Sequence, residues 1–153
     1  MQILGASFGK GQGKEGVELA FEHLIEKGLL DILPVSFYEN MHFNKDTEFI
    51  EDYLRVLSDK TFELRNRDEF LLNIGGDHTI ALGTVSGILK AKPDTSLIWV
   101  DSHADFNDMN SSITGNLHGM PLNGLIHGKK TFNNLMFQWL ENGFIKPENV
   151  AII

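Results

Sequence analysis

Short apolar runs alternate along the chain with longer segments in which apolar residues recur at helical spacing. The runs are too short and too apolar for amphipathic helices, and they predict buried strands at 3–8, 32–38, 70–74, 97–100 and 150–153. The longer segments predict helices over 17–25, 46–64, 79–90 and 132–141. This alternation is typical of an α/β fold, with an open, mostly parallel sheet and helices on both faces.

In such sheets ligands bind at the carboxyl ends of the strands, so the loops after the strands are where chemistry is expected. The first loop, residues 11–16, is a G-x-G-x-x-G string, and Glu39 lies near the position of a ribose-binding acid. A dinucleotide-binding module is therefore one alternative. The glycines begin at Gly9, outside a single tight turn, and no second half of a dinucleotide domain follows. We favour a flexible connection or lid.

Polar residues follow the third and fourth predicted strands. His78 comes just after the third strand, behind two glycines, and Asp101, His103 and Asp105 follow the fourth. Alternate residues of an extended segment point the same way, so the last three side chains can converge on one point. We expect them to lie within a few ångströms of His78, at the carboxyl ends of adjacent parallel strands.

Two imidazoles and two carboxylates without sulfur suit Mn(II), with Zn, Co or Fe as competitors. A carboxylate between two ions can bridge them, as in two-metal hydrolases. Each residue also has a simpler explanation, because Asp77, Asp101 or Asp105 could turn the chain or cap an element. The pattern also fits a non-heme iron facial triad, which normally belongs to a sheet-rich barrel. For three further histidines we favour structural roles: His23, His42 and His127.

Composition narrows the classes of function. The chain has 153 residues and a hydrophobic content of 42%, which fits one domain with a sizeable core. A net charge of -8 argues against a nucleic-acid surface, and the absence of cysteine leaves His, Asp and Glu as metal ligands. No signal peptide or membrane span is evident, so we expect a cytoplasmic protein with no membrane partner.

Three motifs carry a resemblance to a known family. Residues 75–79 are Gly-Gly-Asp-His-Thr, 101–105 are Asp-Ser-His-Ala-Asp, and 114–121 are Thr-Gly-Asn-Leu-His-Gly-Met-Pro. Together they resemble successive signatures of the arginase (ureohydrolase) family, in order and at family-like spacing. The third string is more similar to arginases than to agmatinases or formiminoglutamases. The departures are Thr79 for a usual Ser, Ser102 for a usual Ala and Thr114 for a usual Ser.

The resemblance implies the three-layer arginase fold and hydrolysis of L-arginine to L-ornithine and urea at a two-manganese site. It implies that His78 and Asp105 hold one manganese ion, that His103 holds the other and that Asp101 bridges them. His118 matches the family's proton shuttle, which an imidazole can serve near neutral pH. Three further positions match contacts to the amino-acid end of the substrate, although each could equally form a turn: Asn107, Ser112 and Thr114.

The resemblance also implies that part of the site lies beyond Ile153, because the family has a later Asp-x-Asp metal motif and a Glu that receives the guanidinium group. We therefore expect residues 1–153 to be the N-terminal part of a single arginase-like domain, incomplete at its C-terminus and weak or inactive alone. Family members form trimers or hexamers, so a homo-oligomer is expected of the full-length protein. The alternatives are a non-catalytic half-domain that associates with an arginase subunit and another ureohydrolase of agmatinase or formiminoglutamase type.

Overall fold

Strands and helices alternate along the chain, as the computed structural model of residues 1–153 shows. The strands are β1 (Gln2–Ser7), β2 (Phe37–His42), β3 (Leu71–Gly75), β4 (Leu97–Trp99) and β5 (Val150–Ile152). The α-helices are α1 (Ala20–Glu26), α2 (Leu29–Ile32), α3 (Ile50–Arg65), α4 (Ala81–Ala91) and α5 (Pro121–His127). Short 3-10 helices are η1 (Val17–Leu19), η2 (His78–Ile80), η3 (Leu117–Gly119), η4 (Gly128–Phe132), η5 (Gln138–Leu140) and η6 (Pro147–Asn149).

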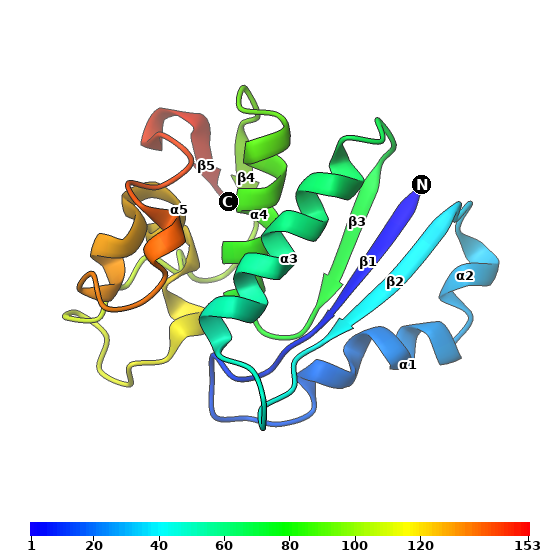
Figure 1. Ribbon diagram of the computed structural model, residues 1–153, viewed down its shortest axis with the longest axis horizontal. Helices are drawn as coiled ribbons and strands as arrows, with labels where there is room; N and C mark the ends of the chain where they lie inside the picture. The colour runs from blue at the N-terminus through cyan, green and yellow to red at the C-terminus, as the bar shows by residue number, and fades with distance from the viewer.

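The strands form two parallel sheets, one with the order β2-β1-β3 and one made of β4 and β5. The central strand β1 is buried along its whole length. Leu4 and Ala6 belong to the same apolar core as residues of α3, whereas a side chain at Gly5 would meet Phe21 of α1. Because neighbouring residues of a strand point to opposite faces, α1 and α3 cover opposite faces of the first sheet (Figure 1). The predicted α/β class with a parallel sheet is confirmed.

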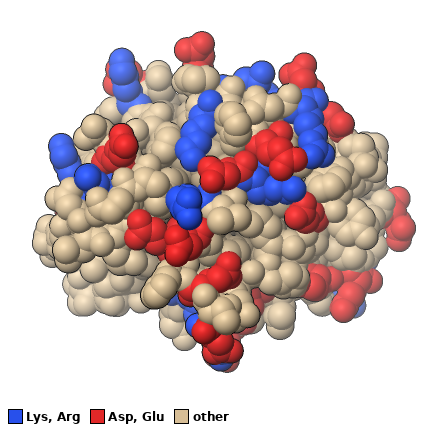
Figure 2. Space-filling model, viewed as in Figure 1, with Lys and Arg blue, Asp and Glu red and all other residues tan.

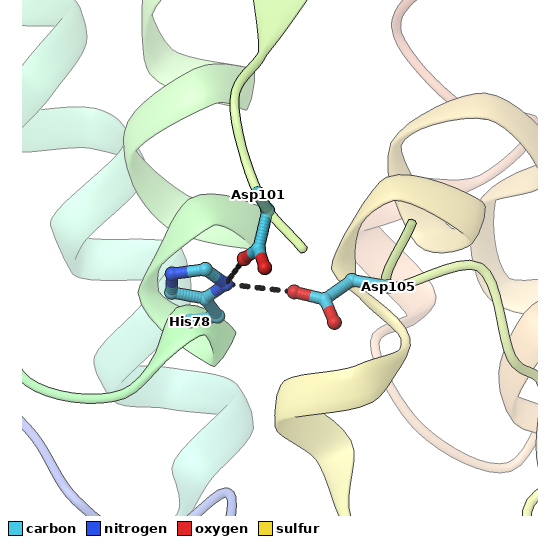
Figure 3. Close-up of side chains that lie close together, drawn as sticks. All are labelled: His78, Asp101 and Asp105. Atoms are coloured by element: carbon cyan, nitrogen blue, oxygen red, sulfur yellow. Dashed lines mark hydrogen bonds and ion pairs between the residues drawn. The ribbon is translucent and has the colours of Figure 1, made fainter. Parts of the chain in front are cut away.

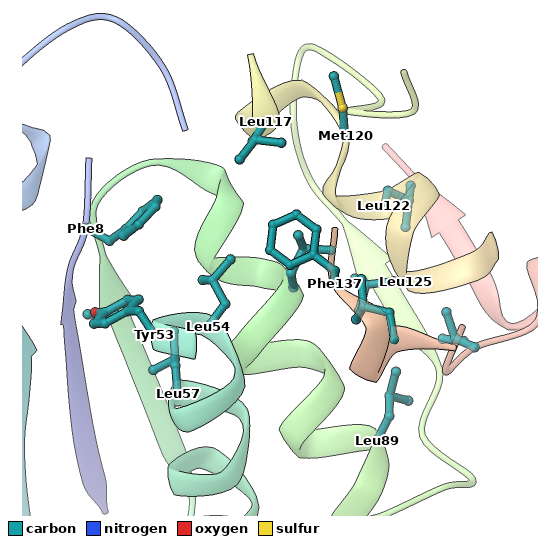
Figure 4. Close-up of a cluster of buried hydrophobic side chains, with 14 of the residues drawn as sticks. Phe8, Tyr53, Leu54, Leu57, Leu89, Leu117, Met120, Leu122, Leu125 and Phe137 are labelled. Carbon is teal, nitrogen blue, oxygen red and sulfur yellow. The ribbon is translucent and has the colours of Figure 1, made fainter. Parts of the chain in front are cut away.

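The main core joins the first sheet to the C-terminal third of the chain (Figure 4). Helices α3 and α4 pack side by side, and the Ser86 hydroxyl donates to the Ser58 hydroxyl between them at 2.9 Å. On the far side of α4, Leu122 and Leu125 of α5 and Phe137 complete the same cluster. This packing fixes the positions of the loops after β3 and β4, which carry the candidate site.

Two predicted elements are wrong. The strand predicted at 32–38 begins only at Phe37, because Gly28 (φ 87°) starts the short helix α2 and Pro34 holds Leu33 in an extended conformation that ends it. The helix predicted at 132–141 is absent. Asn133 and Asn134 adopt positive φ angles there, which break a helix, and η4 and η5 stand on either side of them.

The remaining helix predictions differ in their bounds. The second predicted helix, expected from residue 46, begins at Ile50 because Phe49 is extended and exposed. The third, expected at 79–90, is η2 followed by α4. Helix α5 was not predicted. No helix is both long and apolar enough to pass through a membrane.

The surface carries charges of both signs. On the face shown in Figure 2, Lys and Arg side chains stand beside Asp and Glu side chains. Ion pairs on α3 include Arg55 with Asp52 at 3.4 Å and Lys60 with Glu63 at 3.5 Å. Exposed pairs of this kind contribute little stability, so the fold depends chiefly on the apolar core.

Candidate functional site

The turn after β3 brings His78 to the edge of a pocket. Gly76 donates its N–H to the Ala6 carbonyl at 3.2 Å, and a Cβ at Gly76 would overlap the Phe8 carbonyl. Only a glycine therefore lets the chain pass so close to β1. Asp77, which is buried, then caps η2 by accepting the N–H of Thr79 at 2.9 Å. The order of small and capping residues thus places the His78 ring just past the strand end.

His78 meets two carboxylates (Figure 3). Its Nδ1 lies 2.7 Å from Asp105 Oδ2 and 3.0 Å from Asp101 Oδ2. The possible ligand atoms of these three residues all lie within 4.8 Å of one another. Asp105 has a positive φ of 46° and a side chain only 8% exposed, so its carboxylate is fixed by a tight turn and by burial.

The strands that carry these side chains are not hydrogen-bonded neighbours, because β3 and β4 belong to different sheets. The expected placement on adjacent strands is therefore wrong. The side chains converge because the segments after the strands close the distance: the His78 ring stands edge-on to Trp99 of β4, with centroids 5.8 Å apart.

Asp101 lies between two imidazoles. One of its oxygens faces His78, and the other lies 3.6 Å from His103 Nδ1. The backbone N–H of His103 donates to Asp101 at 2.9 Å and holds the pKa of this carboxyl below its usual value; partial burial opposes the shift, and the two imidazoles add to it. The His103 side chain is 83% exposed and lies outside the tight group of three.

A single open pocket of about 1020 Å³ collects the residues singled out by sequence. It is lined by His78, Asp101, His103, Asp105, Asn107, Ser112, Thr114 and His118. Sequence reasoning missed several further lining residues, among them Gln12, Gly13, Lys14 and Asn116. The first three belong to the loop taken as a connection or lid, and Asn116 stands inside the third motif, two residues before His118, where it could have been identified.

The donor set fits a hard or borderline divalent cation. Two carboxylates and an imidazole converge, with a second imidazole beside the shared carboxylate, and no sulfur is present. Nitrogen and oxygen ligands of this kind suit Mn(II) and its competitors. His78 is half exposed toward an open pocket, so an ion has access to the carboxylates.

Comparison with known proteins finds similarity to arginases along the whole chain. The arginase family model matches residues 1–153. The arginase of Glaciozyma antarctica is 32% identical over 173 residues, which cover 99% of this chain and 50% of that protein. A crystal structure of arginase from Bacillus subtilis superposes with a TM-score of 0.78 at 31% identity, covering 99% of this chain and 54% of the other. An Entamoeba histolytica arginase, solved in complex with L-ornithine, matches with a TM-score of 0.75 at 25% identity, with 99% and 56% covered.

The chain spans about half the length of these relatives. A family-model match over every residue, together with the fold and the order of the motifs, leaves no other assignment open. The chain belongs to the arginase family.

Proposed function

We propose that residues 1–153 are the N-terminal part of a single arginase-type domain that hydrolyses L-arginine to L-ornithine and urea at a two-manganese site. The observation that carries this proposal is the convergence of His78, Asp101 and Asp105 in one pocket of an arginase-family chain. The L-ornithine bound to the Entamoeba histolytica relative supports the same substrate class.

In this proposal His78, Asp101 and Asp105 hold one manganese ion, and His103 holds the second with Asp101 shared between them. The two oxygens of Asp101 face different imidazoles, an arrangement that would let this carboxylate serve both ions. When bound, such ions act as Lewis acids and lower the pKa of water, so that a nucleophile exists near neutral pH.

His118 is the proposed proton shuttle, because it lines the same pocket and lies outside the tight metal group. Asn107, Ser112 and Thr114 are the proposed contacts to the amino-acid end of the substrate. The hydroxyls of Ser112 and Thr114 accept the backbone N–H groups of Gly115 and Asn116, which leaves each O–H free to donate to a carboxylate.

The dinucleotide alternative is not favoured. The loop of residues 11–16 contributes to the wall of the same pocket as the His78, Asp101 and Asp105 group, so it belongs to the candidate metal site. Glu39, the candidate ribose ligand, pairs with Lys60 at 2.8 Å. Cytoplasmic location and assembly into a homo-oligomer stay predictions from the family resemblance.

A manganese titration of this chain tests the proposed site. We expect Asp105→Asn to weaken Mn(II) binding by at least ~10-fold, measured by the free Mn(II) electron paramagnetic resonance signal, because it removes a buried anionic ligand. Asp108→Asn is the control: it removes a carboxylate from the same loop, one that accepts the backbone N–H groups of Asn110 and Ser111 and lies outside the metal group. Equal affinities of the two variants would overturn the metal assignment.

A further inference from the structure

One residue, Gly11, links two parts of the pocket that are far apart in sequence. The N–H of Gly11 donates to Asp77 Oδ2 at 2.8 Å. The Gly11 carbonyl accepts the backbone N–H of His118 at 3.1 Å and also lies 3.1 Å from His118 Nδ1. The backbone of Gly11 therefore connects the Asp77 carboxylate, through its N–H, with the His118 ring, through its carbonyl.

The surroundings of Asp77 fix its carboxylate in place for the contact with Gly11. Its side chain is buried, and its other oxygen accepts the N–H of Thr79 at 2.9 Å. Each oxygen thus has its own backbone donor, and hydrogen bonds to an ionised acceptor are stronger than neutral ones. The loop that carries Gly11 is otherwise exposed from Gly13 to Val17, so Asp77 anchors the loop at the point where it meets His118.

The approach is possible only because residue 11 is a glycine. A Cβ there would overlap Thr79 Oγ1 and press on Asp77 Oδ1. Any larger residue would push the loop away from η2 and carry the Gly11 carbonyl away from His118. The close contact is therefore fixed by steric fit as well as by hydrogen bonds.

The contact determines where the ring proton of His118 lies. A carbonyl oxygen only accepts, so the nitrogen facing it must carry the hydrogen. Neutral His118 is then the Nδ1–H tautomer, with the lone pair on Nε2, since the tautomer of an imidazole is set by the partner of its other nitrogen.

We propose that Asp77 is a positioning residue for His118: by anchoring the backbone of Gly11 it holds the ring as the Nδ1–H tautomer, so that Nε2 is the nitrogen that exchanges protons with the substrate. Nδ1 keeps its hydrogen throughout, while Nε2 takes up one proton and gives it to the departing amine. The catalytic part of this statement rests on the proposed role of His118. The tautomer of His118 and its control by Asp77 are independent of that proposed role.

The test uses the ¹⁵N-labelled, metal-free 153-residue chain at about pH 8.5, roughly two pH units above the ordinary histidine pKa. Two-bond ¹H–¹⁵N correlation spectra show which ring nitrogen is protonated, and His118→Gln identifies the His118 signals among the six histidines. We expect Nδ1–H in the unmodified chain. Nε2–H there would overturn the proposal at once.

The informative variant is Asp77→Ser. Serine still caps a helix start, so η2 keeps its cap, but its single oxygen leaves the Gly11 N–H without an acceptor. We expect the His118 ring to move toward the Nε2–H tautomer and the Gly11 amide to exchange with solvent at least ~10-fold faster. Asp108→Ser, which alters an exposed turn of the same type, should change neither.

An unchanged tautomer in a folded Asp77→Ser chain would overturn the role of Asp77. If that variant does not fold, Asp77→Asn replaces it: the side chain keeps its shape but has one accepting oxygen for two N–H groups, and exchange of the Gly11 amide shows whether that N–H has lost its acceptor. If neither variant folds, Asp77 serves folding alone and the proposal fails. The experiment needs neither manganese nor substrate, so its failure is distinct from failure of the metal titration.

Discussion

At the scale of single residues, a change at His118 distinguishes a proton-transfer role from a metal-binding role. It lines the pocket but does not belong to the group of His78, Asp101 and Asp105. In a completed enzyme we therefore expect His118→Ala to lower turnover by ~10²- to 10⁴-fold, the usual contribution of a general acid or base, with manganese affinity unchanged. Steady-state kinetics and a manganese titration on the same preparation measure both. A variant that loses manganese instead would identify His118 as a ligand.

The close packing around Gly76 leaves no room for a side chain at this position. Its Cβ position coincides with the Phe8 carbonyl, and neither backbone segment can move without disturbing β1. We expect Gly76→Ala to destabilise the chain by about 2 kcal/mol or more, at or above the middle of the usual range for overpacking. Gly13→Ala, whose Cβ would meet nothing within 4 Å, should stay within about 0.5 kcal/mol. Urea denaturation of the two variants gives the comparison, and equal midpoints would contradict it.

At the scale of elements, α3 is held against the first sheet by Tyr53. Its ring stacks on Phe8 at 5.4 Å, and its hydroxyl donates to the Met41 carbonyl at 2.9 Å. Burial, and secondarily the charge of Glu48, raises the pKa of Tyr53 above its ordinary value of about 10. Because the folded state keeps this phenol neutral while the unfolded state can ionise it, stability is retained below pH 10 and falls as the pH rises beyond it.

The Tyr53→Phe variant tests this pH dependence. At pH 8 we expect it to be less stable by about 1 kcal/mol, from loss of the hydrogen bond to Met41. Above pH 10 the deficit should shrink, since phenylalanine has no ionised form that favours unfolding. Denaturant midpoints at pH 8 and 11 measure the difference, and absorbance near 295 nm reports phenol ionisation. A Tyr53 that ionises in the folded chain would contradict the expectation.

The elements also show what periodicity predicts and what it does not. Four of five strands were placed correctly within a few residues because their apolar runs are bounded by polar residues or glycine. The second strand was misplaced since β2 carries polar residues such as Glu39 and Asn40, whereas the apolar residues before it form α2. The helix predicted at 132–141 does not form because Asn133 and Asn134 adopt the left-handed conformation. The spacing of apolar residues gives no sign of this conformation.

The sequence also picked out residues that the structure brings into one pocket. The residues after β3 and β4 were identified because a strand end followed by His or Asp at alternate positions is a local signal. The separation of β3 from β4 is a long-range property, and nothing near His78 or Asp101 encodes it. The roles of Gly11 and Asp77 were missed for the same reason, because their contact joins positions 66 residues apart.

At the scale of the whole molecule, the two sheets leave strand edges without partners. In the second sheet β4 pairs only with β5, and Ile98 of β4 and the following Val100 are 64% and 76% exposed. Exposed apolar strand edges favour association. The sedimentation coefficient of the isolated chain is therefore expected to rise with protein concentration, and Ile98→Lys should reduce that rise. A concentration-independent monomer would contradict this expectation.

The last prediction is that these 153 residues alone hydrolyse arginine negligibly. One ion would find three converging protein ligands, but a second would be left with the exposed His103 and the shared Asp101. Two protein ligands hold a divalent ion poorly in competition with water. A single ion cannot stabilise both the attacking and the leaving group as two ions do. The family's guanidinium-binding Glu has no counterpart among the residues that line the pocket, and substrate placement alone can contribute several kcal/mol to lowering the barrier. Such losses compound without adding simply.

The assay is urea release with excess Mn(II) at mildly alkaline pH, with a full-length arginase as positive control and the mass of the chain verified. We expect turnover below about one hundredth of the control, the loss typical when one catalytic group alone is missing. Asp105→Asn should leave that residual rate unchanged if it is background, whereas it should abolish any rate that comes from the His78 group. Turnover within about tenfold of the control that Asp105→Asn removes would show that this chain completes a working site, through a second copy of itself or through ligands now outside the pocket.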